Sequence, residues 1–176
     1  MTTIVEVLQE GLHGQHRMID EAVRDLTAEQ LHWTPPDAKT NHIGFTLWHY
    51  VRTEDNIAQF VLQGRKPTVW IDGGYFERFG LDRISQGTGM STDDAHALRL
   101  PPMDDWMAYQ RDVWQATDAY LSSLDEAALE QMVTIRPLPE MKVRQALSNM
   151  MLTHGHSHFG EICVLRVLQG LASSVI

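Results

Sequence analysis

Four long stretches of the sequence repeat apolar residues at helical spacing, and this pattern restricts the chain to a helical fold. The stretches cover residues 3–26, 42–62, 103–124 and 142–171. In the last stretch, for example, the apolar face runs from Val143 to Leu168. Helices of this kind bury their apolar faces against one another, so we predict an all-α fold, a four-helix bundle. The length of 176 residues suits a single domain, which we expect to cover residues 1–176.

The connector between the second and third helices is the longest. Residues 64–102 contain six of the twelve glycines and three of the seven prolines, and both residue types interrupt helices. A structureless loop of this length is uncommon in a compact domain, so we expect local structure there, including a short helix capped by Ser91. We also expect a short helical turn after Thr27 and a brief extended piece at 133–135.

The charge balance argues against two classes of partner. The chain has 14 basic and 23 acidic residues, a net charge of −9, so it repels phosphate backbones and anionic lipids. We therefore expect no nucleic-acid partner and no membrane partner, and no stretch has the roughly 18 apolar residues of a membrane span. The single cysteine excludes an internal disulfide, and the N-terminus lacks a signal-peptide pattern. A cytoplasmic location is the expectation.

Histidines are the residues most suggestive of chemistry. His154 and His158 lie four residues apart in the last helix, so they share one face and could bind one metal ion. His49 on the second helix lies among apolar residues and could supply a third imidazole. Three protein ligands would leave at least one coordination position open. A buried, hydrogen-bonded cluster without metal fits the same spacing, and spacing alone leaves both interpretations open.

The other six histidines have simpler explanations. His16 is expected at the rim of the first helix, whereas His13, His96 and His156 are expected at the surface. His32 and His42 lie in connectors, where they would cap a helix or contact solvent.

Two carboxylates, Glu54 and Glu161, fall on inward-facing helix stripes. Either could orient a ligand imidazole or act as a base. The alternative is an ion pair with a nearby arginine, such as Arg52 or Arg166.

The segments that carry the three histidines resemble motifs of the DinB-like (DinB/YfiT) superfamily. Residues 43–55, IGFTLWHYVRTED, are similar to its second-helix motif, in which a histidine is followed by an acidic pair. Residues 154–162, HGHSHFGEI, are similar to its last-helix motif, and residues 31–35, LHWTP, to the connector after its first helix. The similarity extends along the whole chain in order and spacing.

This resemblance implies an up-down-down-up four-helix bundle that is often a homodimer. It also implies a divalent metal ion, zinc or nickel among others, held by the three motif histidines, which here are His49, His154 and His158. Characterised members of the superfamily include transferases and isomerases that use glutathione, mycothiol or bacillithiol. Many other members have no known activity.

Together, the residues and the resemblance lead to one main expectation and one alternative. The main expectation is a metal-dependent enzyme that acts on a small molecule, either a transferase of a low-molecular-weight thiol co-substrate or a hydrolase. Glu54 is the expected catalytic residue, as a base or as a support for a ligand. Residues 64–102, with Trp70, Tyr75 and Phe76, would form the wall or lid of the pocket. The alternative is a non-catalytic dimer that binds a metal ion or a small molecule.

Overall fold

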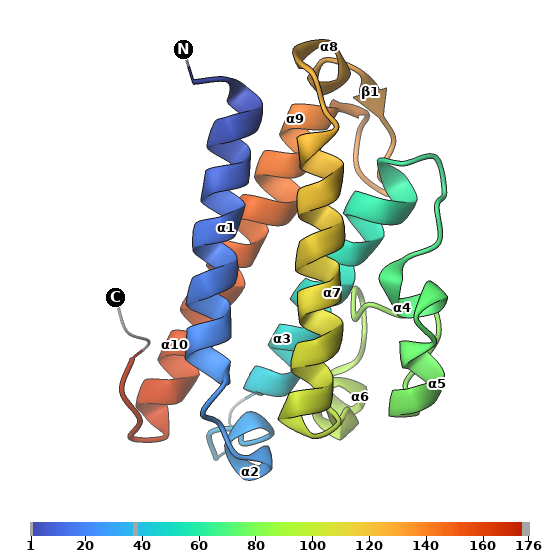
Figure 1. Cartoon of the computed structure of the whole chain (residues 1–176). Coiled ribbons are helices and arrows are strands. Elements are labelled where there is room, and N and C mark those ends of the chain that lie inside the picture. The colour runs from blue at the N-terminus through green and yellow to red at the C-terminus, as the bar shows by residue number, and fades with distance from the viewer. Residues whose placement is uncertain (1, 37–38, 174–176) are drawn as a thin grey trace.

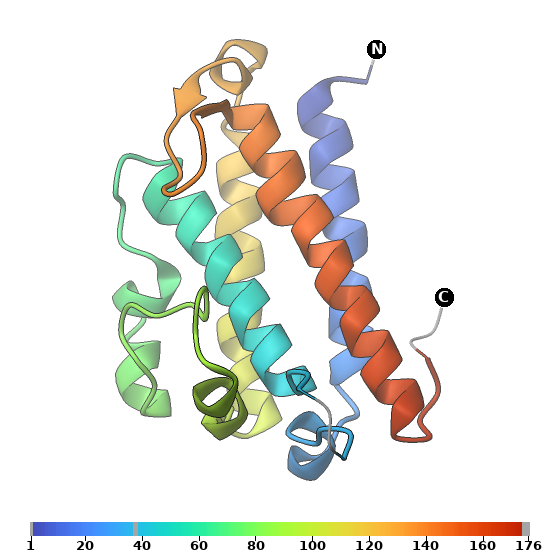
Figure 2. The same cartoon turned by 180° about the vertical axis from the view of Figure 1, so that it is seen from behind.

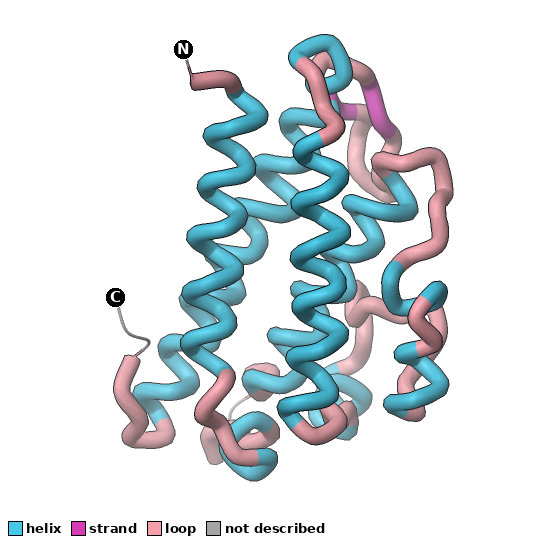
Figure 3. Tube along the Cα trace, in the orientation of Figure 1, coloured by secondary structure: helices cyan, strands magenta, loops and turns pink. Residues whose placement is uncertain are grey.

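The computed structural model describes residues 2–36 and 39–173, and it is mostly helical, as the sequence predicts (Figure 1 and Figure 3). The four predicted stretches are each helical to within three residues of the expected ends. They are α1 (Ile4–Val23); α3 (Ile43–Asp55) continued by η1 (Asn56–Val61); α7 (Met103–Ser122); and a last run of α9 (Val143–Ala146), η2 (Leu147–Thr153) and α10 (His154–Leu168). Both η segments are π-helical.

The four long helical runs lie side by side. Figure 1 and Figure 2 show α1 and the last run pointing one way, and α3 and α7 pointing the other way. α1 packs against α7 and α10, and α3 packs against the same two helices. Within the described residues, no helix has both the length and the apolar character needed to cross a membrane.

Short elements fill the connectors. They are α2 (Ala28–Leu31), α4 (Val69–Asp72), α5 (Tyr75–Phe79), α6 (Thr92–Ala97), α8 (Glu126–Leu129), β1 (Met132–Val133) and β2 (Met141–Lys142). The local structure expected in residues 64–102 is therefore present, and Ser91 caps α6 by accepting a hydrogen bond from the Asp94 amide, as predicted. The extended piece expected at 133–135 is present only in part, because β1 covers Met132–Val133 and pairs antiparallel with β2.

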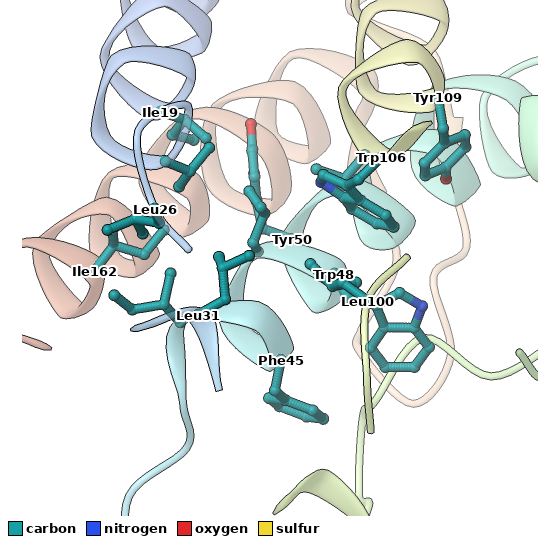
Figure 4. Close-up of a cluster of buried hydrophobic side chains, with 14 of the residues drawn as sticks. Ile19, Leu26, Leu31, Phe45, Trp48, Tyr50, Leu100, Trp106, Tyr109 and Ile162 are labelled. Atoms are coloured by element: carbon teal, nitrogen blue, oxygen red, sulfur yellow. The ribbon is translucent and has the colours of Figure 1, made fainter. Parts of the chain in front are cut away.

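The long connector is folded onto the bundle through a buried carboxylate. Asp55 is fully buried at the end of α3 and accepts hydrogen bonds from the amides of Val69 and Trp70, at 2.8 and 2.9 Å, and from the Tyr109 hydroxyl at 3.0 Å. The Trp70 ring packs edge-on against Tyr109, with 5.0 Å between ring centroids. Trp106, Tyr109 and other aromatic and aliphatic side chains of this core are drawn in Figure 4.

Three connector histidines form hydrogen bonds with backbone groups. His42 caps α3, as expected for a connector histidine, because its Nδ1 accepts a hydrogen bond from the Phe45 amide at 2.9 Å. His32 Nε2 accepts from the Leu100 amide at 3.0 Å. His96 was expected at the surface, but it is only half-exposed because its Nε2 donates to the Thr40 carbonyl at 2.7 Å. His32 and His42 both accept backbone hydrogen bonds, which requires neutral rings.

The neutral state of His42 predicts a loss of stability in acid. Burial, together with the nearby His32, lowers the pKa of His42 from its ordinary 6.5 to about 4. The unfolded chain therefore binds more protons between these values, so the free energy of unfolding falls as pH drops below 6.5 and levels off near 4. For His42 alone we expect a loss of about 2 kcal/mol between pH 7 and pH 5.

Urea unfolding of metal-free protein at the two pH values, for wild type and His42→Asn, measures this contribution. Asparagine keeps a capping oxygen but does not titrate. The fall in the free energy of unfolding between pH 7 and pH 5 should be smaller in the variant by about 2 kcal/mol. An identical fall in both proteins would refute the role of His42.

Candidate metal centre

The fold brings together the three histidines that the sequence singled out. His49 comes from α3, and His154 and His158 come from α10. One nitrogen from each ring lies within 4.8 Å of the others. The His49 ring stands nearly perpendicular to the other two, with centroids 5.2 Å from His154 and 5.0 Å from His158. The Nε2 atoms of His154 and His158 are 2.8 Å apart.

A glycine lets the helix that carries two of these histidines approach its neighbours. Gly155 is buried next to His154, and a Cβ atom placed there would lie 1.5 Å from Gln15 Nε2 and 2.6 Å from Tyr50 Cε2. Any other residue would push α10 away from α1 and α3. Gly155 therefore sets the distance between the two helices that position the histidines.

Two of the imidazoles are oriented by acceptors on their outer nitrogens. His49 Nδ1 hydrogen-bonds the carbonyl oxygen of Gln86, and His158 Nδ1 lies 2.9 Å from Glu161 Oε2. A carbonyl and a carboxylate only accept, so each Nδ1 carries the proton and each Nε2 is the unprotonated nitrogen, which for His158 lies 2.8 Å from His154 Nε2. Histidines that bind metal ions in proteins almost always have such a partner on the other nitrogen.

The electrostatics favour neutral His49 and His154 rings and an ionised Glu161 carboxylate. Burial lowers the pKa of His154 to about 4, with a further contribution from His158, and burial also lowers the pKa of His49. Neutral imidazole is the form that binds metal ions. The hydrogen bond with His158 lowers the pKa of the Glu161 carboxyl, so Glu161 is negative at neutral pH.

The three rings open onto a cavity of about 530 Å³. α3 and α10 form two of its walls, and residues 87–90 and Thr92 of the long connector form another. The connector thus lines the pocket, but Trp70, Tyr75 and Phe76, the aromatic residues expected there, are not among its lining residues. Trp70 and Tyr75 are buried in the core because their rings pack against Tyr109.

The connector segment that supports His49 is held in place by an arginine and a glycine. Buried Arg52 reaches the carbonyls of Ile84 and Ser85, at 3.5 and 3.4 Å. Gly87 has a φ of 91°, and a Cβ atom there would lie 2.9 Å from both Phe45 and Trp48, so only glycine fits without strain. The Gln86 carbonyl is a site group that sequence analysis missed, because a backbone oxygen has no residue signature.

Glu54, the expected catalytic residue, lies elsewhere. Its side chain is fully buried and does not line the cavity. Its Oε2 accepts a hydrogen bond from the Tyr50 hydroxyl at 2.5 Å and lies 3.0 Å from His16 Nε2. His16 is expected at the rim but is buried, because its ring stacks on the Trp114 ring with 3.8 Å between ring centroids.

The two arginines considered as ion-pair partners of Glu54 and Glu161 pair with other carboxylates. Arg52 pairs with Asp55 at 3.6 Å rather than with Glu54, and Arg166 pairs with Asp25 at 2.8 Å rather than with Glu161. Of the two carboxylates considered from the sequence, Glu161 is the one that contacts the histidine cluster. His13 and His156 are exposed, as predicted.

Comparisons with known proteins agree with this architecture. The model of the DinB superfamily matches residues 12–162. A crystal structure of a conserved protein from Enterococcus faecalis superposes with a TM-score of 0.75 over 97% of this chain and 99% of that chain, at 17% sequence identity. At this identity the likeness shows the fold alone. No curated protein sequence matches the chain.

Proposed function

The chain belongs to the DinB superfamily, and from this premise we propose that it binds one divalent metal ion through His49, His154 and His158. The observation that supports this proposal most is the convergence of one nitrogen from each of the three rings within 4.8 Å, with the Nδ1 atoms of His49 and His158 paired to Gln86 and Glu161. Imidazole ligands suit zinc and nickel. We propose that the bundle is a single up-down-down-up domain.

The ligand set favours an enzyme over a structural metal site. Among the described residues, no other His, Cys, Asp or Glu joins the cluster of three. Structural zinc sites are usually closed by four protein ligands, whereas catalytic sites keep one position open. A bound divalent cation would act as a Lewis acid and lower the pKa of a water or a thiol at that position. We therefore propose a transferase of a low-molecular-weight thiol or a hydrolase.

The protein's own residues orient the site and shape its pocket. Gln86 and Glu161 fix the rings of His49 and His158. Glu54 enters the proposal as a positioning residue, because it holds Tyr50, whose ring lies 6.1 Å from the His154 ring. Its expected role as a base stays a prediction. A homodimer is also proposed, and sedimentation at micromolar concentration checks it.

Metal analysis of untagged protein tests the metal proposal. We expect about one equivalent per chain, given three convergent imidazoles. Less than about a tenth of an equivalent, both as purified and after incubation with zinc or nickel, would refute it.

Cobalt substitution separates an open site from a closed one. Adding a small thiol to cobalt-loaded protein should produce a sulfur-to-cobalt charge-transfer band, because an open position accepts the thiolate. Without that band the thiol-transferase proposal fails. Unchanged d–d spectra with thiols, azide and acetate alike would favour the alternative of a non-catalytic metal-binding protein.

Removing the carboxylate that orients His158 should weaken metal binding. Glu161→Ala is expected to lower metal affinity by about 10- to 100-fold, the range found when such supporting partners are lost. Glu161→Gln keeps an acceptor oxygen, so its loss of metal affinity should be much smaller. Competition with a chelator dye measures both variants, with exposed Glu126→Ala in α8 as the control. Equal affinities for all four proteins would exclude a role for Glu161.

A further inference from the structure

A second cavity adjoins the one that holds the three histidines. Its volume is about 860 Å³, and it shares Thr53, Thr88 and Met150 with the histidine cavity. The end of the α3–η1 run forms one side, and residues 134–138 form the other. Figure 2 shows the loop between β1 and β2 descending beside the end of that helical run. The two cavities therefore share part of their lining.

The charge of this second cavity is opposite to that of the whole chain. Arg65 and Arg136 line it, and no described acidic residue does, although the chain carries a net charge of −9. Within residues 2–36 and 39–173, neither guanidinium forms an ion pair. A guanidinium presents a planar set of donors that matches carboxylate, sulfonate or phosphate oxygens.

Apolar surface accompanies these positive charges. Phe60 and Leu138 both line the cavity, with 41% and 38% of their surface exposed. Ile57 and Ile135 add further apolar lining. Ligand sites commonly combine apolar walls with a few fixed polar groups. This lining fits a molecule with an apolar body and one negative group.

Another cavity that shares Lys39 and Glu161 with the histidine cavity is less suited to an anion. Its volume is about 720 Å³, and its charged lining residues are Lys39 and Glu161, whose charges cancel. Val164 and Leu168 make it largely apolar. The two arginines therefore distinguish the cavity beside η1.

We propose that the cavity beside η1 binds the anionic end of a small organic molecule, with its negative group at Arg65 and Arg136 and its apolar part against Phe60 and Leu138. The other end of the molecule reaches the three histidines, a part of the inference that rests on the proposed function. The substrate class is thus an organic anion whose reactive group is separated from the charge by an apolar spacer.

A pair of fluorescent probes tests the anion site on metal-free protein. Anilinonaphthalene sulfonate carries one negative charge, and phenylnaphthylamine has the same rings without it. Changing both arginines, Arg65→Gln with Arg136→Gln, should lower the affinity for the sulfonate probe by about tenfold or more. The affinity for the neutral probe should fall by less than about twofold.

Lys66→Gln is the matched control, because Lys66 is exposed next to Arg65 but does not line the cavity. It should leave both probes unchanged, and circular dichroism checks that all variants fold. Equal losses for the two probes, or no loss of the sulfonate probe in the double variant, would overturn the proposal.

A second measurement tests the link to the histidines separately. With cobalt-loaded protein, mercaptohexanoate should give the charge-transfer band at about tenfold lower concentration than mercaptohexanol, and the double variant should remove that difference. If neither thiol gives the band, the thiol-transferase proposal fails while the result with the fluorescent probes still decides the anion site. If both thiols bind equally to the wild type, the link between the two cavities is refuted.

Discussion

Gly155→Ala is expected to destabilise the metal-free protein by about 3 kcal/mol or more. A Cβ atom at this position would lie 1.5 Å from Gln15 Nε2 and 2.6 Å from Tyr50 Cε2. Gln15 is fully buried and donates to the Tyr50 hydroxyl at 2.5 Å, so it cannot move aside without losing that bond. Overpacking costs about 1–3 kcal/mol, and an unsatisfied buried polar group costs about as much again. The gain in helix propensity, about 1 kcal/mol, is smaller.

Gly160→Ala is the matched control for this substitution. Gly160 lies on the same helix, α10, but is exposed, and a Cβ atom there would meet nothing within 4 Å. This variant should be more stable than wild type by about 0.5–1 kcal/mol, because alanine favours the helix. Urea unfolding followed by circular dichroism compares the two variants. Similar stabilities for both would mean that α10 does not depend on the close approach at Gly155.

The second large effect is expected from removing one imidazole of the cluster. His158→Ala should lower metal affinity by well over 100-fold, because losing only a supporting partner of a ligand already costs about 10- to 100-fold. His156→Ala is the control, since His156 lies two residues away, is exposed, and hydrogen-bonds the Leu152 carbonyl instead of the cluster. Its affinity should match that of the wild type.

Thermal unfolding gives an independent readout of the same substitution. A ligand that binds only the folded state stabilises it by about 4 kcal/mol at a thousand times its Kd. Added zinc should therefore raise the Tm of the wild type and of His156→Ala, and leave that of His158→Ala nearly unchanged. A metal-dependent rise in His158→Ala as large as in the wild type would remove His158 from the ligand set.

Helical periodicity predicted where the long helices lie, but not every inward face. The spacing placed Leu168 on the same face as Val143, yet Leu168 is 57% exposed while Val143 is 4% exposed. The π-helical segment η2 lies between them, and its wider turn shifts the angular position of each later residue. The count of 100° per residue therefore no longer predicts the inward face at the end of α10. Over the shorter span from His154 to His158 the count holds.

The sequence could identify the three histidines but not the groups that support them. Glu54 and Asp55 are adjacent acidic residues on α3, and one points to Tyr50 and His16 while the other holds the connector. The role of each neighbour depends on the His16 side chain of α1 and on two backbone amides of α4, and both helices are remote in sequence. The Gln86 carbonyl depends on the path of a connector with no helical or strand period to predict it.

The contact between His49 and the Gln86 carbonyl links cation binding to the position of the long connector. A cation that requires the His49 ring in this orientation also favours the docked position of the connector, because Gln86 belongs to it. Thermodynamic reciprocity then requires that anything that secures the connector raises affinity for the cation by the same factor. Gln86 and Thr88 also line the cavity with the two arginines. Occupants of the two cavities are therefore expected to bind cooperatively, with the connector as their shared wall.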